Sequence, residues 1–489
     1  MIKRSNALTM EKEKMMWRFF AGDSSKVVIS DFVDRRLFFT CLGILGALFS
    51  FDASAQTLKE ALTAAYMQNP TLLGQRANLR AADEKVPQAL SNWRPNVSFT
   101  GSAGGSAVMT STIDGVNRHQ HREPKSIGIT VTQNIFQGGK TIADTNSAEN
   151  TVQAERARLL KKEQDILLLA AKAFLNVYKD EAVLNLNINN KEVLKRQMQA
   201  TRDRFQVGEI TRTDVYQASA RMAGASADLT DSEGSLKSSR ATYKNVIGMS
   251  APKNLVLPKS PDGLPNNLDE VIQLALKYNP SVIAAEFDRK ALDNNVEKVR
   301  SELLPSLDLK TGLSKKFQSG SETGRIDTAD ITLNLTIPLY QKGTVYSKMR
   351  EAKQKVEKGI YTLDQARRDA IEAATTAWES LLSARARVKS FKSQNEANKV
   401  ALEGVEREAQ VGSRTVLDVL DAEQELLDSR VSYVTSERDE ILAVYELKVS
   451  IGQLTAKDMQ LEVDTYSPVG NYNQVRGKWF GASVTDGAK

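Results

Sequence analysis

Apolar residues along two long stretches of the chain are spaced as they would be on coiled-coil helices. Residues 140–207 contain neither Pro nor Gly, and a helix of that length spans about 100 Å. Apolar side chains recur there and in a second stretch at Leu160, Leu167, Phe174, Leu184 and Ile188, then at Ile371, Trp378, Leu381, Leu382 and Val388. So long a helix cannot be enclosed in one globular core, and it must pack laterally. We therefore predict two helical hairpins, at residues 140–248 and 344–452.

Four shorter segments alternate apolar and polar residues with the period of a β-strand. They lie at residues 97–100, 127–132, 307–310 and 331–337. We expect two β-hairpins, at about 96–136 and 306–339, each with one apolar and one polar face. Together with the long helices, these segments predict the α+β class.

The chain also matches itself, which indicates an internal duplication. At an offset of 210, Leu58, Glu60, Asn69, Pro70 and Pro95 fall on Leu268, Glu270, Asn279, Pro280 and Pro305. At an offset of 204, the match covers Gln137 with Gln341 and Gly139 with Gly343. The same offset aligns residues 206–208 with 410–412, 214–215 with 418–419, and 247–248 with 451–452. We predict two structural repeats, residues 56–248 and 268–452, with a linker at 249–267 and a C-terminal tail at 453–489.

The N-terminal segment has the features of a secretory signal. Arg35 and Arg36 precede an apolar stretch from Leu37 to Phe51, and the small residues 53–55 follow. This pattern predicts cleavage before Gln56, with a retained membrane anchor as the alternative. Residues 1–34 are either an extended n-region or the product of a start codon placed too far upstream.

Charge and hydropathy limit the partners. Removal of residues 1–55 takes away eight Lys/Arg and six Asp/Glu, which lowers the net charge from +6 to +4. That balance does not suit a nucleic-acid-binding surface. No later stretch approaches 18 consecutive apolar residues. If the mature protein crosses a membrane, it must do so as a closed β-barrel, because a bilayer leaves open strand edges unsatisfied.

The composition disfavours catalysis. The 489 residues include one Cys and two His, too few for a zinc cluster, a disulfide framework or a Cys–His pair. His119 and His121 fall together in a polar loop, for which we expect solvent exposure rather than metal binding, and they leave no Ser-His-Asp set. No Gly-rich phosphate loop of the Walker type occurs. The sequence therefore predicts no enzyme activity, no metal site and no cofactor.

The turns of the two helical hairpins differ in an informative way. Gly208 and Gly412 suit a helix end, and the aspartates that follow, Asp214 and Asp418, suit the start of the return helix. A shared capping role explains both aspartates. Only the second turn adds a further acidic residue and a basic residue: Asp421 where the first has Gln217, and Arg414 where the first has Ile210. The two aspartates of the second turn share one helix face, so a specialised role and a solvated face both remain open.

At these residues the chain resembles the TolC family of outer-membrane channel proteins, over essentially its whole mature length. The resemblance rests on the signal, the duplicated Leu-x-Glu-Ala-Leu…Asn-Pro opening at 58–70, the paired strand segments and residues 412–422, which are similar to the family's periplasmic entrance motif. It implies a homotrimer in which three chains of four strands close one 12-stranded barrel in the outer membrane, above a 12-helix tunnel in the periplasm. Physics supports that arrangement, because four strands alone cannot close a pore.

The resemblance also implies roles for the residues of the turns. Asp418 and Asp421 would form a cation-selective ring at the periplasmic entrance. Arg414 would join Thr213 and Asp214 in a latch that holds the entrance closed, although Ala409 stands where close family members place a Tyr. The tips that would contact a periplasmic adaptor are Val207, Gly208 and Glu209, and Val411, Gly412 and Ser413. The alternative for Arg414 is a contact with the C-terminal end of its own preceding helix.

We therefore expect a passive exit duct in the outer membrane that works with an inner-membrane transporter and a periplasmic adaptor and contacts outer-membrane lipid. The cargo could be drugs or secreted proteins, since a duct without an energy-using site does not reveal its pump. The alternative is a periplasmic helical scaffold or adaptor. Such a protein would share the coiled coil and lack the strand hairpins with a lipid-compatible face.

Overall fold

The computed structural model describes residues 57–111, 114–115, 117–252, 255–259, 261, 263–318 and 323–484. The chain divides into two units, Met1–Ser54 and Ala55–Lys489, and the described residues belong to the second. The predicted signal at residues 1–55 and its cleavage before Gln56 lie outside the described residues.

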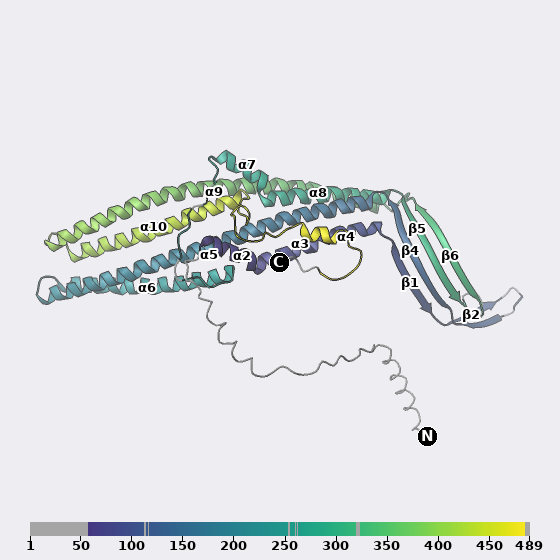
Figure 1. The fold of residues 1–489 in the computed structure, drawn as a ribbon, viewed down its shortest axis with the longest axis horizontal. Coiled ribbons are helices and arrows are strands. Elements are labelled where there is room, and N and C mark those ends of the chain that lie inside the picture. The colour runs from purple at the N-terminus through teal and green to yellow at the C-terminus, as the bar shows by residue number, and fades with distance from the viewer. Residues whose placement is uncertain are drawn as a thin grey trace, which may run out of the picture. The chain divides into compact units, whose positions relative to one another are not determined.

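Four long helices form two hairpins, as the apolar spacing predicts. They are α5 (Lys140–Gln206), α6 (Arg212–Ile247), α9 (Thr344–Gln410) and α10 (Val416–Ser450). In Figure 1 the helices of each hairpin run side by side and their turns lie at the end of this unit opposite the sheet. Helices α5 and α9 each contain 67 residues, a length of about 100 Å.

Shorter helices precede each long hairpin and lie against it. They are α2 (Leu58–Gln68), α3 (Pro70–Asp83), α4 (Lys85–Leu90), α7 (Leu268–Tyr278) and α8 (Pro280–Arg300), with short 3-10 turns at Ser91–Trp93 and Ser301–Leu303. In the first repeat, Glu84 separates α3 from α4, whereas the equivalent helix of the second repeat, α8, is continuous.

The duplicated Asn-Pro pair has a structural role. The Asn69 side chain caps α3 by accepting from the Thr71 amide at 2.9 Å, and its Nδ2 donates to the Val246 carbonyl oxygen at 2.9 Å. Asn279 repeats both contacts, with the Ser281 amide at 2.9 Å and the Ser450 carbonyl oxygen at 3.2 Å. Each Asn therefore ties the start of one helix to the end of a return helix.

The strands form one antiparallel sheet in the order β1-β4-β5-β6. Its members are β1 (Asn96–Ala103), β4 (Lys125–Gln137), β5 (Ser306–Phe317) and β6 (Arg325–Thr336). Strands β4 and β5 pair although they are far apart in sequence, with Thr130 opposite Gly312 and a bulge between Asn134 and Phe136. Among the described residues, β1 and β6 are the free edges of the sheet.

The two His residues lie in a strand and not in the solvated loop that the sequence analysis expects. Strands β2 (Ser106–Ser111) and β3 (Asn117–Arg122) form a separate two-stranded hairpin, and both His residues lie in β3. The side chains of His119 and His121 are exposed there. The sequence of these strands does not alternate apolar and polar residues, which is why the period-two pattern missed them.

The main core lies where α2 and α3 pack on α5, and the C-terminal tail completes it. Phe174, Leu167 and Tyr243 are fully buried in this cluster, together with Leu454 of the tail. Helix α11 (Gly470–Val475) follows in the tail, which returns to the first half of the chain through Asn471 and Asp83. Among the helices that the structure describes, none is long and apolar enough to cross a membrane.

Candidate functional site

The turns of the two long hairpins expose the residues predicted to contact a partner. All six predicted tip residues are exposed. Val207 and Val411 are the most conspicuous, because these apolar side chains remain 78% and 80% accessible. Each turn thus exposes one valine, a feature that hydrophobic packing within the chain does not explain.

Glycine ends both long helices in the same way. Gly208 and Gly412 both have φ of +78°, a left-handed conformation that a side chain disfavours. In the first turn, Arg204 pairs with Glu209 across the helix end. In the second, the Ser413 hydroxyl and amide both donate to the Glu408 carbonyl oxygen, each at 2.9 Å.

The predicted capping role of the two aspartates is confirmed. The Thr211 amide donates to Asp214 Oδ2 at 2.9 Å, and the Thr415 amide donates to Asp418 Oδ2 at 2.8 Å. Each Thr hydroxyl in turn accepts from the amide of its aspartate, which completes a capping box. The hydrogen bond from the Thr415 amide is the main reason that the pKa of Asp418 is lowered from its ordinary value.

The residues of the predicted latch are not brought together within one chain. Arg414 Nε lies 2.8 Å from Glu408 Oε2, so the guanidinium contacts the end of its own preceding helix. Asp214 is engaged in its capping box, and Thr213 is exposed beside it. The contact of Arg414 is therefore the one expected from the alternative interpretation.

An ion pair that the sequence analysis missed joins the two hairpins near their turns. Arg221 Nη2 on α6 lies 2.5 Å from Asp421 Oδ1 on α10. A small apolar cluster links the same hairpins and is formed by Leu194, Ala218, Ala225, Val416 and Leu420. The predicted ring residue Asp421 thus has a basic partner on the neighbouring hairpin, 200 positions away in sequence.

A second residue missed by the sequence analysis is Glu423, half a helical turn beyond Asp421. Its side chain is buried, at 8% exposure, and its Oε2 has no hydrogen-bond partner. Burial, followed by the nearby charge of Glu406, raises the pKa of Glu423 to about 7, and Arg196 opposes that shift. The sequence signal for this site was an acidic residue at a position of α10 that faces the protein interior.

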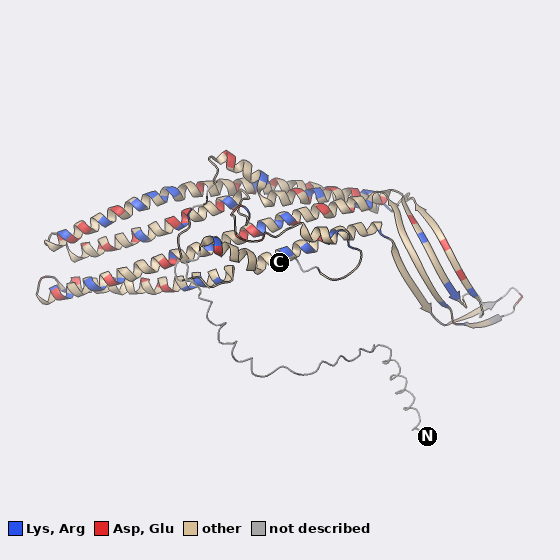
Figure 2. Ribbon diagram, in the orientation of Figure 1, with Lys and Arg blue, Asp and Glu red and all other residues tan. Residues whose placement is uncertain are grey.

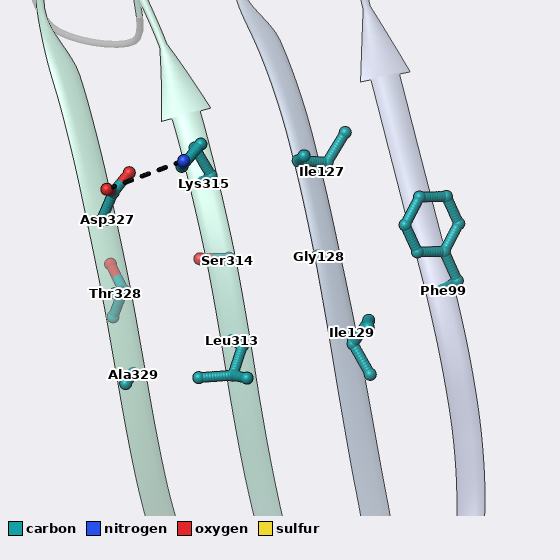
Figure 3. A pocket seen from close by; sticks show the side chains of 10 residues that line it. All are labelled: Phe99, Ile127, Gly128, Ile129, Leu313, Ser314, Lys315, Asp327, Thr328 and Ala329. Atoms are coloured by element: carbon teal, nitrogen blue, oxygen red, sulfur yellow. Dashed lines mark ion pairs between the residues drawn. The ribbon is translucent and has the colours of Figure 1, made fainter.

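The sheet forms a second candidate surface, at the opposite end of this unit. Residues that pair directly across strands share a face, so one face carries mainly apolar side chains: Val97, Phe99, Ile127, Ile129, Val131, Leu307, Leu309, Leu313, Ala329, Ile331, Leu333 and Leu335. Figure 3 shows the shallow apolar hollow of this face, with Phe99, Ile127, Ile129 and Leu313. The other face carries Ser, Thr, Asn and Gly at most positions, as the period-two pattern predicts.

The described residues thus combine a two-faced antiparallel sheet with helical hairpins about 100 Å long. The sequence model of the family described as "Outer membrane efflux protein" matches the chain twice, at residues 61–249 and 271–453. The chain belongs to this outer membrane efflux protein family, whose members are transport proteins rather than enzymes.

Known proteins agree with that assignment. The chain is 33% identical over 436 residues to the outer membrane efflux protein BepC of Brucella suis biovar 1, covering 89% of this chain and 94% of BepC. It is 24% identical over 443 residues to the outer membrane protein TolC of Escherichia coli, covering 87% and 88%. The solved outer membrane channel CmeC of Campylobacter jejuni matches the fold with a TM-score of 0.71 at 15% identity, covering 93% of this chain and 98% of CmeC. The predicted family, outer-membrane location and channel function are confirmed.

Proposed function

We propose that three copies of this chain assemble into one channel, with a 12-stranded barrel in the outer membrane and a 12-helix tunnel in the periplasm. The observation that carries the proposal is the open sheet, whose edges β1 and β6 are unpaired among the described residues. Strand β6 is 12 residues long and exposed throughout. An edge of that length invites pairing with another chain, and ring closure would pair β6 of one copy with β1 of the next.

The duct is passive and acts as the exit of a three-part export system. In this proposal the two repeats, 56–248 and 268–452, are joined by the linker 249–267, and each supplies one strand hairpin to the barrel and one helical hairpin to the tunnel. In the tail 453–489, residues Leu454 and Asn471 contact the first repeat. An inner-membrane transporter supplies the energy, and a periplasmic adaptor contacts the exposed tips around Val207 and Val411. The chain itself uses no cofactor and performs no catalysis.

The entrance of the duct lies at the turns. Asp418 and Asp421 of three copies would supply six carboxylates to one constriction, an arrangement that favours cations. Within a chain Asp421 is already paired with Arg221, so closure of the entrance would depend on that pair as well as on Arg414. A contact of Arg414 with Thr213 and Asp214 would then have to form between neighbouring copies.

Two adjacent substitutions on β6 test the proposal. Ile331 lies on the apolar face and Thr332 on the polar face, near the middle of the strand. A Lys that faces lipid at mid-membrane costs about 2–4 kcal/mol, whereas a Lys that faces the lumen is tolerated. We expect Thr332→Lys to yield outer-membrane trimers on an unheated gel and Ile331→Lys to yield few. Equal trimer yields from the two variants, or a soluble periplasmic monomer from the unmodified chain, would contradict the barrel.

A further inference from the structure

We propose that the outer end of the apolar sheet face binds the phosphate groups of outer-leaflet lipids, through a basic row formed by Lys125, Lys315 and Arg325. This inference rests on the proposed function, in which the apolar face meets the membrane. In that orientation the helical hairpins extend from one end of the sheet into the periplasm. The other end of the sheet therefore faces the outside of the cell.

The strand register places the three basic residues on the apolar face. Lys125 is opposite Phe317, which is opposite Arg325, and these residues form one row across β4, β5 and β6. In the next row, Lys315 lies opposite Ile127 and Asp327. Neighbouring strands are about 4.8 Å apart, so the three cations lie within roughly 10 Å of one another, the scale of one lipid headgroup.

The row keeps a surplus of positive charge after its own ion pairs are counted. Asp327 Oδ2 lies 2.5 Å from Arg325 Nη2 and 4.0 Å from Lys315 Nζ, the second pair being the dashed line in Figure 3. Lys125 lies 3.5 Å from Glu123, which precedes β4. Three cations therefore face two carboxylates. The side chains of Lys125 and Arg325 remain 59% and 55% accessible, so both cations can still donate to a further anion.

The charge is confined to one end of the face. Along the four strands, the apolar face has no Lys, Arg, Asp or Glu at any described position closer to the helices than Lys315 and Asp327. Figure 2 shows residues of both charges spread along the long helices. If these charges served only solubility, they would not be restricted to the end of the sheet farthest from the helices. Basic clusters at a membrane surface bind anionic lipid headgroups.

An aromatic side chain in the same row fixes the depth. Phe317 lies between Lys125 and Arg325 and is partly exposed. Aromatic residues gather at the two interfaces of membrane barrels, where one end of the ring meets acyl chains and the other meets headgroups. Phe317 is the last residue of β5 and Arg325 the first of β6, so the basic row lies at the end of the sheet, at headgroup level rather than among the acyl chains.

Adjacent lysines on β5 provide a matched test. Lys315 lies on the apolar face with the basic row, whereas its neighbour Lys316 lies on the polar face, opposite Ile326. Native mass spectrometry of detergent-solubilised trimers titrated with lipid A gives an apparent Kd. Each cation near an anionic membrane surface contributes enough for about a fivefold change in binding. We expect Lys125→Gln and Lys315→Gln each to weaken lipid A binding about fivefold, and Lys316→Gln to leave it unchanged.

Two outcomes would overturn the proposed lipid binding and leave the proposed channel function unaffected. The first is a trimer whose lipid A binding is the same in all three variants. The second is displacement of lipid A by millimolar inorganic phosphate alone, which would indicate a site for free anions. Loss of the trimer in every sample, including the unmodified chain, would instead overturn the proposed function and this inference together.

Discussion

Arg221 on α6 and Asp421 on α10 form an ion pair that joins the two helical hairpins close to their turns. The two residues are far apart in sequence, and neither has a charged counterpart of the same sign in the other repeat: Gln217 corresponds to Asp421, and Glu425 corresponds to Arg221. The pair is therefore a feature of the contact between the hairpins rather than of either hairpin alone.

Removal of this pair should increase the resting conductance of the channel. A partly exposed ion pair contributes about 0.2–1 kcal/mol, which corresponds to as much as a fivefold change in the open population. We expect Arg221→Ala and Asp421→Ala each to raise the open probability of the channel in planar bilayers, and the effect to shrink at high salt. The charge swap, Arg221→Asp with Asp421→Arg, should restore the resting value. Glu425→Ala, at an exposed position on the same helix, is the control, and an equal rise there would refute the role of the pair.

The two roles assigned to Asp418 can be separated by two substitutions at one position. Asn keeps an acceptor for the Thr415 amide, whereas Ala removes it and opens the capping box at the start of α10. If Asp418 also belongs to an entrance ring, both variants should lose cation selectivity, while only Asp418→Ala should speed hydrogen exchange in the first turns of α10. Unchanged selectivity in both variants would limit Asp418 to capping.

Glu423 should make the hairpins less stable as the pH rises. In the folded state its pKa is raised to about 7, mainly by burial, so the folded state is more stable when Glu423 is protonated. The ionised form therefore costs stability progressively from about pH 4.5 upward, and the full cost is present above pH 7. We expect a loss on the order of 2 kcal/mol, less than the whole shift implies because solvent screens part of the charge.

Glu423→Gln tests this sign. The variant should match the unmodified protein at pH 4 and should protect the amides of α10 better than the unmodified protein at pH 8, as measured by hydrogen exchange. The charges that face Glu423 are Glu406 on α9 and Arg196 on α5, so Glu406→Gln should give part of the same gain. A variant less stable than the unmodified protein at pH 8 would show that the carboxylate has a partner in the assembled channel.

Two equivalent glycines should respond differently to Ala. Gly248 and Gly452 end the return helices with φ of +88° and +76°, so each substitution costs roughly 1 kcal/mol in backbone strain. A Cβ at position 452 would also overlap the backbone carbonyl of Tyr278, whereas one at position 248 meets only the end of the Gln68 side chain at 3.2 Å. Gly452→Ala should lower the melting temperature clearly more than Gly248→Ala does. Equal melting temperatures would mean that the backbone of α7 yields freely.

The sequence predicted the elements that follow from periodicity. The absence of Pro and Gly from 140–207 marked α5, and period-two alternation marked the four strands of the main sheet, whose two faces differ in polarity. The hairpin of β2 and β3 escaped this logic because its sequence does not alternate apolar and polar residues. The Asn-Pro pairs were visible as a repeat, but the bond from Asn69 to the Val246 carbonyl depends on packing between distant helices.

The site was predicted unevenly for a similar reason. The capping role of Asp214 and Asp418 is local, and spacing from Gly208 and Gly412 was enough to find it. The partners of the charged residues are not local: Arg414 meets Glu408, and Asp421 meets Arg221. A comparison of equivalent positions in two repeats shows which residues differ and does not show which residues meet between hairpins.

A disulfide between chains is the most direct test of whether three chains close one barrel. The chain has a single Cys, Cys41, so a Cys41→Ser background is free of other thiols. One Cys on edge strand β1, at Ser98, is combined in turn with one Cys at successive residues of edge strand β6, from Thr328 to Thr336. If three chains close one barrel, at least one combination yields a covalent trimer on a heated, non-reducing gel, while every single-Cys variant yields none. Ladders that end at a dimer or pass beyond a trimer, or monomers at every position, would contradict it.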